Sequence, residues 1–314
     1  MKEKIITVTL NPSIDKTVFV EKLNPNELNR AEQTRLDPGG KGVNVARALK
    51  NFGVDILATG LIAGESGRRL LDYLSRGGVS VDFYEIDGDT RTNLKILDQS
   101  NQKITEINEK GFFVSEQDLN GFRNKFIALL EFTDIVVLSG SLPPGVPQNF
   151  YYECIQLAKR KGKKVILDAD GEAFVAGVQA APFAIKPNLP ELELVIGKKL
   201  STINEIVKAV MYFLDKGIDI VIVSMGADGA VIGNHDEIYK ADTWDISVKG
   251  ATGSGDSMVA ALAYSLLHNY PLTDVAKMTI AAGTITASKV GTQVCTLDEV
   301  VESLDYVQLH KIRE

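Results

Sequence analysis

The chain has few cysteines and histidines, and their positions exclude most metal and disulfide chemistry. Among its 314 residues, Cys154 and Cys295 are the two cysteines, too few for a disulfide framework and not part of a C-x-x-C motif. The three histidines are far apart, and neither an H-E-x-x-H motif nor a Cys/His cluster occurs. A zinc site built from such a motif is therefore not expected.

The sequence also lacks an excess of positive charge and any long apolar segment. It has 34 Lys and Arg against 41 Asp and Glu, a net charge of −7, which argues against binding nucleic acid through bulk charge. The apolar run at residues 5–10 is too short for the core of a signal peptide. The longest uncharged stretch, residues 257–273, falls short of a membrane span. We expect a soluble, cytoplasmic protein with no nucleic-acid or membrane partner.

Short apolar runs rich in β-branched residues alternate with helical patterns along the chain. The apolar runs occur at residues 5–10, 56–61, 135–138, 165–167 and 220–223. The helical patterns lie between them, at residues 42–51, 67–77, 116–131, 149–161 and 204–216. This alternation predicts an α/β fold with a parallel sheet and crossover helices. The C-terminal third is expected to be mostly helical, at residues 256–267, 272–288 and 297–304.

Two segments interrupt this alternation. Residues 17–20 have strand character, and a polar segment rather than a helix follows them. Residues 93–97 and 103–107 flank a polar turn and predict an antiparallel hairpin. Together these segments predict a small sheet inserted into the α/β body.

A glycine-rich segment at residues 37–46 is the first candidate ligand site. Gly39, Gly40 and Gly42 let the backbone approach a ligand closely, Lys41 and Asn44 offer donors, and the following helix adds its positive end. The segment is not a P-loop, because no Ser or Thr follows the lysine. The alternative is an ordinary glycine turn with a solvated lysine.

A second glycine-rich segment, Thr252-Gly253-Ser254-Gly255-Asp256-Ser257, leads into an apolar helix. Glycines at a helix start expose backbone N–H groups that bind anions, and Asp256 lies at the same end. The N–H groups suit a transferring phosphoryl group, and an aspartate with an ordinary pKa of about 3.9 suffices to accept a hydroxyl proton. The alternative is a plain N-cap. The third glycine of the dinucleotide-binding motif is absent.

Three further groups of residues carry weaker signals. Lys186, Asn188 and Glu191 suit either a helix start or the waters around a nucleotide-bound Mg²⁺. The segment with Ser224, Gly226 and Gly229 follows a buried strand, and a plain β-turn is its favoured interpretation. The last group lies at ends of elements, where a cleft forms at the edge of a sheet: Asp15, Arg91 and Ser139.

In combination, these segments resemble the ribokinase-like (PfkB) carbohydrate kinase family. Residues 39–46 resemble its N-terminal signature, residues 252–257 its C-terminal one and residues 186–191 its middle motif, in the family's order. The resemblance implies a doubly wound, mostly parallel sheet with helices on both faces. It also implies one domain over residues 1–314, with a small β lid formed by about residues 12–38 and 88–110.

Residues 9–15, 88–93 and 139–143 are similar to the family's hexose-phosphate branch, and Ile107-Asn108 followed by Gly111-Phe112 is most similar to its fructose-1-phosphate kinases. The resemblance implies ATP-dependent phosphorylation of fructose 1-phosphate to fructose 1,6-bisphosphate. Tagatose 6-phosphate and fructose 6-phosphate are the alternative substrates, because the shared motifs do not fix where the phosphate sits. A non-catalytic sugar-phosphate sensor is the alternative from another class, and an intact Asp256 beside the glycine loop speaks against it.

The resemblance also assigns roles to residues. Asp256 becomes the catalytic base, with an anion hole formed by the amides of Gly253, Ser254 and Gly255. The residues that bind the sugar are Asp15, Gly39, Gly40, Lys41 and Asn44. The residues that bind the existing phosphate are Arg91 and Ser139. The residues that bind Mg-ATP are Lys186, Asn188, Glu191, Ser224, Gly226 and Gly229, with Glu191 holding Mg²⁺ through water.

Two properties stay open at this point. At residues 250–252 this sequence differs from the residues that usually precede the loop in the family's hexose-phosphate branch. In relatives the residues just before the loop help hold a monovalent cation, so a K⁺ requirement is undecided. A lid sheet has exposed edges that a second lid would cover, which makes a homodimer through the lid an expectation.

Overall fold

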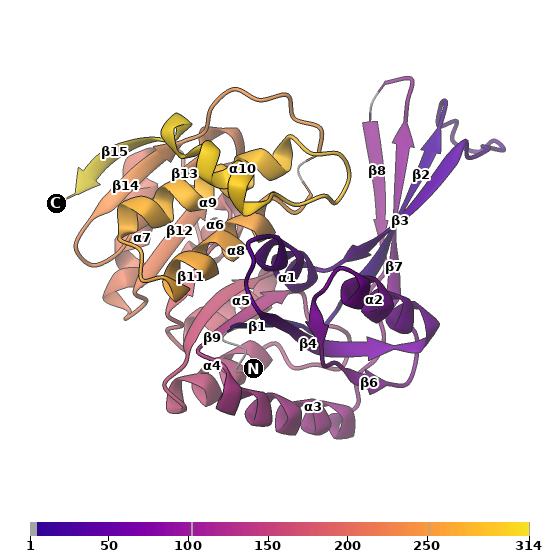
Figure 1. Cartoon of the computed structure of the whole chain (residues 1–314), viewed down its shortest axis with the longest axis horizontal. Helices are drawn as coiled ribbons and strands as arrows, with labels where there is room; N and C mark the ends of the chain where they lie inside the picture. Colours follow the sequence, from indigo (N-terminus) through magenta and orange to yellow (C-terminus); the bar gives the residue numbers. More distant parts are fainter. Residues whose placement is uncertain (1–4, 102, 251, 314) are drawn as a thin grey trace.

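The computed structural model of the chain describes residues 5–101, 103–250 and 252–313. In this part of the chain a large sheet of eleven strands carries helices on both faces, and a four-stranded sheet stands apart from it (Figure 1). The strands of the large sheet follow one another in the order β15 (Gln308–Arg313), β14 (Ile238–Asp242), β13 (Ala230–Gly233), β12 (Ile220–Ser224), β11 (Ala184–Ile185), β10 (Lys164–Ala169), β9 (Ile135–Gly140), β1 (Ile5–Thr9), β4 (Ile56–Ala63) and β5 (Ser80–Val81), with β6 (Tyr84–Ile86) also on β4.

The strands from β5 to β12 are parallel, and β13, β14 and β15 extend the sheet in antiparallel pairs. The central strand β1 is buried throughout, which is why its sequence is apolar without alternation. Ile5 packs into the core on one face, and Ile6 and Val8 pack into the core on the other. The sheet therefore separates two hydrophobic cores.

Helices cover both faces of the large sheet. The helices on one face are α1 (Lys41–Asn51), α2 (Gly64–Arg76), α8 (Ser254–Leu267), α9 (Leu272–Ala287) and α10 (Leu297–Glu302). The helices on the other face are α3 (Glu116–Leu129), α4 (Phe150–Arg160), α5 (Gly171–Val178), α6 (Leu189–Ile196) and α7 (Ile203–Asp215). This arrangement is the predicted doubly wound α/β fold. Within the described residues, no helix is both long and apolar enough to cross a membrane.

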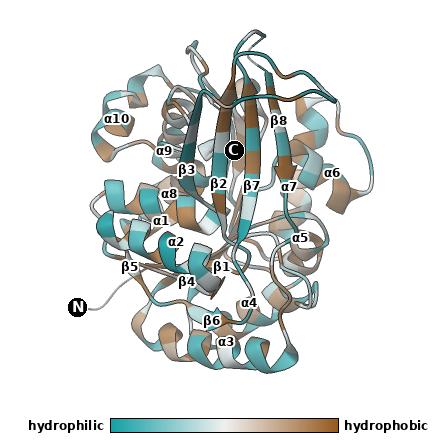
Figure 2. Ribbon diagram, turned by 90° about the vertical axis from the view of Figure 1, so that its right-hand side faces the viewer, coloured by the Kyte–Doolittle hydropathy of each residue, from teal (hydrophilic) through white to brown (hydrophobic). Residues whose placement is uncertain are grey.

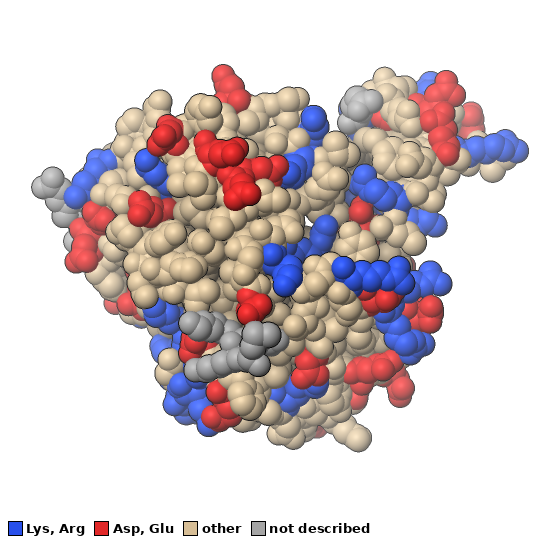
Figure 3. Space-filling model, viewed as in Figure 1, with Lys and Arg blue, Asp and Glu red and all other residues tan. Residues whose placement is uncertain are grey.

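The small sheet has the strand order β3 (Gln33–Gly39), β2 (Ser13–Val20), β7 (Arg91–Asp98) and β8 (Lys103–Asn108). Its strands stand side by side in Figure 2, and the sheet projects from the body at the upper right of Figure 3. The predicted hairpin is confirmed as β7 and β8, and β2 joins β7 in parallel. Ser13 pairs with both Gly39 and Arg91, so the base of this small sheet, which we call the lid, gathers three predicted site segments.

The prediction of a mostly helical C-terminal third was incomplete. It missed β14 and β15, which pair at the edge of the sheet. The sequence of β15, QLHKIR, is polar enough to resemble a surface segment, because an edge strand is only partly covered. Helix α8 also begins at Ser254, two residues before the predicted start. Its N-cap residue Gly253 adopts a φ of 85°, which glycine accommodates without strain.

Candidate active site

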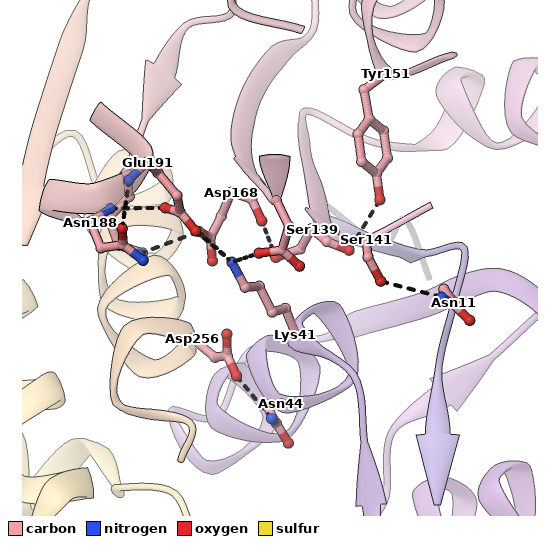
Figure 4. A network of polar contacts seen from close by, with 12 residues as sticks. Asn11, Lys41, Asn44, Ser139, Ser141, Tyr151, Asp168, Asn188, Glu191 and Asp256 are labelled. Atoms are coloured by element: carbon pink, nitrogen blue, oxygen red, sulfur yellow. Dashed lines mark hydrogen bonds and ion pairs between the residues drawn. The ribbon is translucent and has the colours of Figure 1, made fainter. Parts of the chain in front are cut away.

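Lys41 is the centre of a network of charges at the carboxyl end of β10 (Figure 4). Its ammonium lies 2.6 Å from Asp170 Oδ1, 3.4 Å from Asp168 Oδ1 and 3.5 Å from Glu191 Oε1. Burial alone would lower the pKa of Lys41, but these three carboxylates outweigh it and hold that pKa above its ordinary range. Lys41 is therefore a fixed cation rather than the solvated lysine of the alternative interpretation.

Asp256 lies in the first turn of α8 and is 7% exposed. Asn44 of α1 donates a 2.8 Å hydrogen bond from Nδ2 to Asp256 Oδ2. Burial, together with the nearby Asp168 carboxylate, raises the pKa of Asp256 from 3.8 to about 6, while Lys41, Asn44 and Lys186 oppose the rise. The expectation of an ordinary pKa was wrong, because sequence does not show that this helix start is buried. A pKa near 6 is better suited to a base working at neutral pH.

The start of α8 provides donors for an anion. Its N-cap residue is Gly253, and no side chain caps the helix, so Asp256 does not act as the plain N-cap of the alternative interpretation. A Cβ added to Gly255 would lie 3.3 Å from Lys186 Nζ, which places that ammonium beside the loop. The Ser254 hydroxyl is buried and finds no partner in the described part of the chain. Backbone N–H groups, the helix dipole and Lys186 together favour a negative charge here.

The lid contributes Asp15, which is buried at the base of β2. Ser13 Oγ donates to Asp15 Oδ1 at 2.8 Å, Asn93 Nδ2 donates to the same oxygen at 3.2 Å, and Lys95 Nζ lies 3.1 Å from Oδ2. A side chain at Gly39 would overlap Ser13 Oγ and the Asp15 carboxylate. Glycine is thus required there for Asp15 to sit where it does.

Arg91 opens β7 and ties the lid to the end of β1. Its Nη2 donates to the carbonyl of Asn11 and its Nη1 to the carbonyl of Glu109, each at 3.0 Å. Its Nε is buried and has no partner among the residues that the structure describes. Burial lowers the pKa of Arg91, and the carboxylates of Asp15, Asp170 and Glu109 oppose this. A guanidinium with an unpaired buried donor suits an anionic ligand.

Ser139, predicted to act with Arg91, is fully buried in β9, and its hydroxyl donates to the carbonyl of Asp168 at 3.4 Å. Ser141 is the serine connected to Arg91. Its Oγ accepts a 3.3 Å hydrogen bond from Asn11, whose carbonyl accepts from Arg91. The role of Ser139 stays a prediction, and the geometry favours Ser141 as the contact from this segment.

Asn188 and Glu191 act as a helix start, one of the two interpretations given for them, and their role toward a nucleotide-bound Mg²⁺ stays a prediction. They form a capping box at the start of α6, in which Asn188 Oδ1 accepts from the Glu191 N–H at 2.8 Å and Glu191 Oε2 accepts from the Asn188 N–H at 2.9 Å. Glu191 Oε1 faces Lys41. Burial and Asp168 raise the pKa of Glu191, and Lys41 opposes this. The helix cap therefore also fixes a carboxylate in the site.

The segment with Ser224, Gly226 and Gly229 is the turn between β12 and β13. A side chain at Gly229 would overlap the carbonyl of Ala241, so packing against β14 explains this glycine. Gly226 has a φ of 63° and open space around its Cα. The favoured interpretation as a turn is what the structure shows, and a nucleotide contact from this turn stays a prediction.

Sequence reasoning missed Asp168 and Asp170, which hold Lys41, and Lys95, which reaches both Asp15 and Thr252 Oγ1 (3.4 Å). A signal for the two aspartates was present. Asp168 directly follows the buried run at residues 165–167, and Asp170 comes two residues later, at the kind of element end where Asp15 and Ser139 were singled out. Lys95 lies inside a predicted strand, and only the three-dimensional pairing of β7 with β2 brings it to Asp15.

Several solved structures share this architecture. The chain is 28% identical to phosphofructokinase-2 from Escherichia coli in complex with potassium, covering 96% of this chain and 98% of that one with a TM-score of 0.91. It is 31% identical to a protein provisionally named phosphofructokinase from Staphylococcus aureus, over 98% and 99% of the two chains with a TM-score of 0.84. It is 28% identical to a provisionally named 1-phosphofructokinase from Thermotoga maritima, over 99% and 100% with a TM-score of 0.91.

The model of the pfkB family of carbohydrate kinases matches residues 8–299, which is most of the chain. This match includes both glycine-rich segments and the middle motif, and it agrees with the resemblance inferred from them. The chain belongs to the pfkB family of carbohydrate kinases.

Proposed function

We propose that this kinase transfers the γ-phosphoryl group of ATP to the C6 hydroxyl of fructose 1-phosphate and yields fructose 1,6-bisphosphate. The observation that carries the proposal is the buried Asp256 carboxylate, held by Asn44 at the uncapped start of α8 beside Lys186. A base and an anion site thus occupy the same helix turn, as the reaction requires.

In the proposed reaction Asp256 accepts the proton of the C6 hydroxyl. The bond from the sugar oxygen to the γ-phosphorus forms while the bond from that phosphorus to the bridging oxygen breaks, and ADP leaves. The backbone N–H groups of residues 253–255 and the Lys186 ammonium stabilise the negative charge of the transferring group. Asn44 holds the base in place.

The substrate is held from the lid and from α1. Asp15, Gly40, Lys41 and Asn44 bind sugar hydroxyls, and Arg91 binds the phosphate that the sugar already carries. The unpaired Arg91 Nε supports this assignment. Lys95 contacts both Asp15 and Thr252, so the lid connects the sugar site to the loop of the anion hole.

The residues present fit a nucleotide-bound Mg²⁺. Asp168 Oδ2 is buried without a partner in the described part of the chain, and the surrounding acceptors are carboxylate oxygens. Among the described residues no group of three or more His, Cys, Asp and Glu could hold a metal ion. A nucleotide-bound Mg²⁺ takes few protein ligands, because phosphates and water supply the others. Asp168 and Glu191 would hold it, and the bound ion would neutralise phosphate charge. K⁺ binding, which the Escherichia coli relative shows, stays open here.

Tagatose 6-phosphate and fructose 6-phosphate are the alternative substrates. The test measures ADP release with Mg-ATP against fructose 1-phosphate, tagatose 6-phosphate, fructose 6-phosphate and free fructose. We expect the highest kcat/KM with fructose 1-phosphate. A higher value with another sugar phosphate would contradict the assigned substrate, and no turnover with any of them would favour a sensor.

We further propose a cytoplasmic homodimer paired through the lid. Parts of the lid strands β2, β7 and β8 are apolar, as their brown colour in Figure 2 shows. The side chains of Leu36, Ile104 and Ile107 are each more than half exposed. A second lid would cover them. Sedimentation should show a dimer for the unaltered chain and a monomer for the variant Ile104→Asp with Ile107→Asp.

A further inference from the structure

A pocket lined by basic residues lies on the outer face of α1, away from the Lys41 network. A pocket of about 280 Å³ opens there between α1, α2 and the segment before α10. We call it the α1 pocket and define it by Arg47, Lys50, Tyr73, Leu74, Lys289 and Val294. Figure 3 shows basic side chains gathered over α1, between α2 and α10.

The charge of the α1 pocket is unbalanced. Three basic residues line it and, within the described chain, no acidic residue does, although the whole protein carries a net charge of −7. Lys289 is neutralised by Glu299 at 2.6 Å. Lys50 is half-buried, and its ammonium has no hydrogen-bond or ion-pair partner among residues 5–101, 103–250 and 252–313. An ammonium without a carboxylate partner at the wall of a pocket favours an anion from solution.

Arg47 offers further donors to the same pocket. Its Nη1 donates to the carbonyl of Thr292 at 2.9 Å and to Asn44 Oδ1 at 3.3 Å, and its guanidinium lies 5.7 Å from the centre of the Tyr73 ring. In the described structure no hydrogen bond occupies Nε or Nη2. Two adjacent donors on a planar group match the oxygens of a phosphate or carboxylate.

Arg47 also connects the pocket to the catalytic aspartate. It holds the oxygen of the Asn44 amide, and this directs the amide nitrogen toward Asp256 Oδ2, 2.8 Å away. A shift of the guanidinium therefore acts on the group that holds the base. One intervening side chain separates the α1 pocket from the proposed chemistry.

We propose that the α1 pocket binds a small polyanion bearing phosphate or carboxylate groups, and that its occupancy changes turnover through Arg47 and Asn44. The binding stands on the pocket alone, whereas the coupling rests on the proposed role of Asp256. The volume of the α1 pocket, about 280 Å³, suits a small metabolite rather than a single inorganic ion.

The test uses calorimetric titration with pyrophosphate and with malonate as probes, on the full chain and on a matched pair of variants. Lys50→Gln removes the unpartnered charge and should weaken probe binding about tenfold, the value of one charge-assisted contact. Lys50→Arg keeps the charge and should bind nearly as the unaltered chain does. Tighter binding of pyrophosphate would indicate a phosphate ligand, and tighter binding of malonate would indicate a carboxylate ligand. Equal binding to all three proteins, or to none, would overturn the site.

Kinetics tests the coupling separately. Pyrophosphate in the nucleotide site competes with ATP and changes only its apparent KM, so kcat at saturating ATP reports on the α1 pocket. We expect the probe to change kcat of the unaltered enzyme and of Lys50→Arg, and to leave kcat of Lys50→Gln unchanged. Binding with no change in kcat in any of them would overturn the coupling. An inactive enzyme that still binds the probe at Lys50 would instead refute the proposed function.

Discussion

Asn44 and Asp256 lie 212 residues apart in the chain, and Asn44 Nδ2 donates a 2.8 Å hydrogen bond to Asp256 Oδ2. The bond joins the N-terminal glycine segment on α1 to the C-terminal one on α8. It stabilises the charged form of a carboxylate that burial disfavours. The pKa of Asp256, about 6, results from this balance and makes the protonation of this carboxyl sensitive to its neighbours near neutral pH.

The first prediction concerns the pH dependence of turnover. Protonated Asp256 cannot accept the proton of the sugar hydroxyl, so kcat/KM, which reports the free enzyme, should fall as the pH drops through about 6. Asn44→Ala removes a hydrogen bond that lowers this pKa, and the acidic limb should then move to higher pH. Steady-state rates of the unaltered enzyme and of Asn44→Ala, measured across the pH range, check both expectations. An acidic limb in the same place for both proteins would exclude Asn44 as the residue that tunes the base.

The same pKa predicts that ionised Asp256 lowers the free energy of unfolding. Because the folded-state pKa is raised from 3.8 to about 6, the stabilising contribution of the protonated group is lost as pH rises through about 6. The cost above that pH is on the order of 3 kcal/mol. Asp256→Asn stays neutral, so it should raise the unfolding temperature most at about pH 8 and roughly half as much at about pH 5, where the unfolded carboxyl is still ionised. A lower unfolding temperature at both would show that Asp256 has a structural role.

Arg91 should act on substrate binding more than on turnover. Arg91→Ala removes the group proposed to bind the non-reacting phosphate, and KM for the sugar phosphate should rise about 10- to 100-fold. Arg91→Lys keeps the charge but loses the planar fork, so it should recover only part of the loss. The KM for ATP serves as the internal control. An unchanged KM for the sugar phosphate in Arg91→Ala would remove Arg91 from the site.

Gly39 should tolerate no side chain. The Cβ of Gly39→Ala would overlap Ser13 Oγ and the Asp15 carboxylate, so Asp15 must move and sugar affinity must fall. Thr34→Ala alters an exposed position on the same strand and is the matched control for damage to β3. Sugar-phosphate KM is measured for both. Equal KM values in the two variants would show that Asp15 does not bind the sugar.

Local patterns in the sequence predicted much of this structure, and pairing between distant segments accounts for what was missed. The buried runs of β1, β9 and β12 and both glycine segments were recognisable because parallel strands and helix starts carry strong local signatures. Edge strand β15 was missed because its described side chains are mostly exposed and only its pairing with β14 makes it a strand. The raised pKa of Asp256 depends on its burial and on the Asp168 carboxylate, and the place of Lys95 depends on its contacts with Asp15 and Thr252. No local pattern in the sequence reports contacts between such distant segments.

The central claim is that Asp256 is the base of a phosphoryl transfer. The most direct measurement compares kcat and ATP affinity of Asp256→Asn with those of Asp305→Asn, which changes an exposed aspartate. We predict that kcat of Asp256→Asn falls about 10²- to 10⁴-fold while ATP affinity stays nearly unchanged, and that Asp305→Asn behaves as the unaltered enzyme. Turnover of Asp256→Asn close to that of the unaltered enzyme would contradict the account.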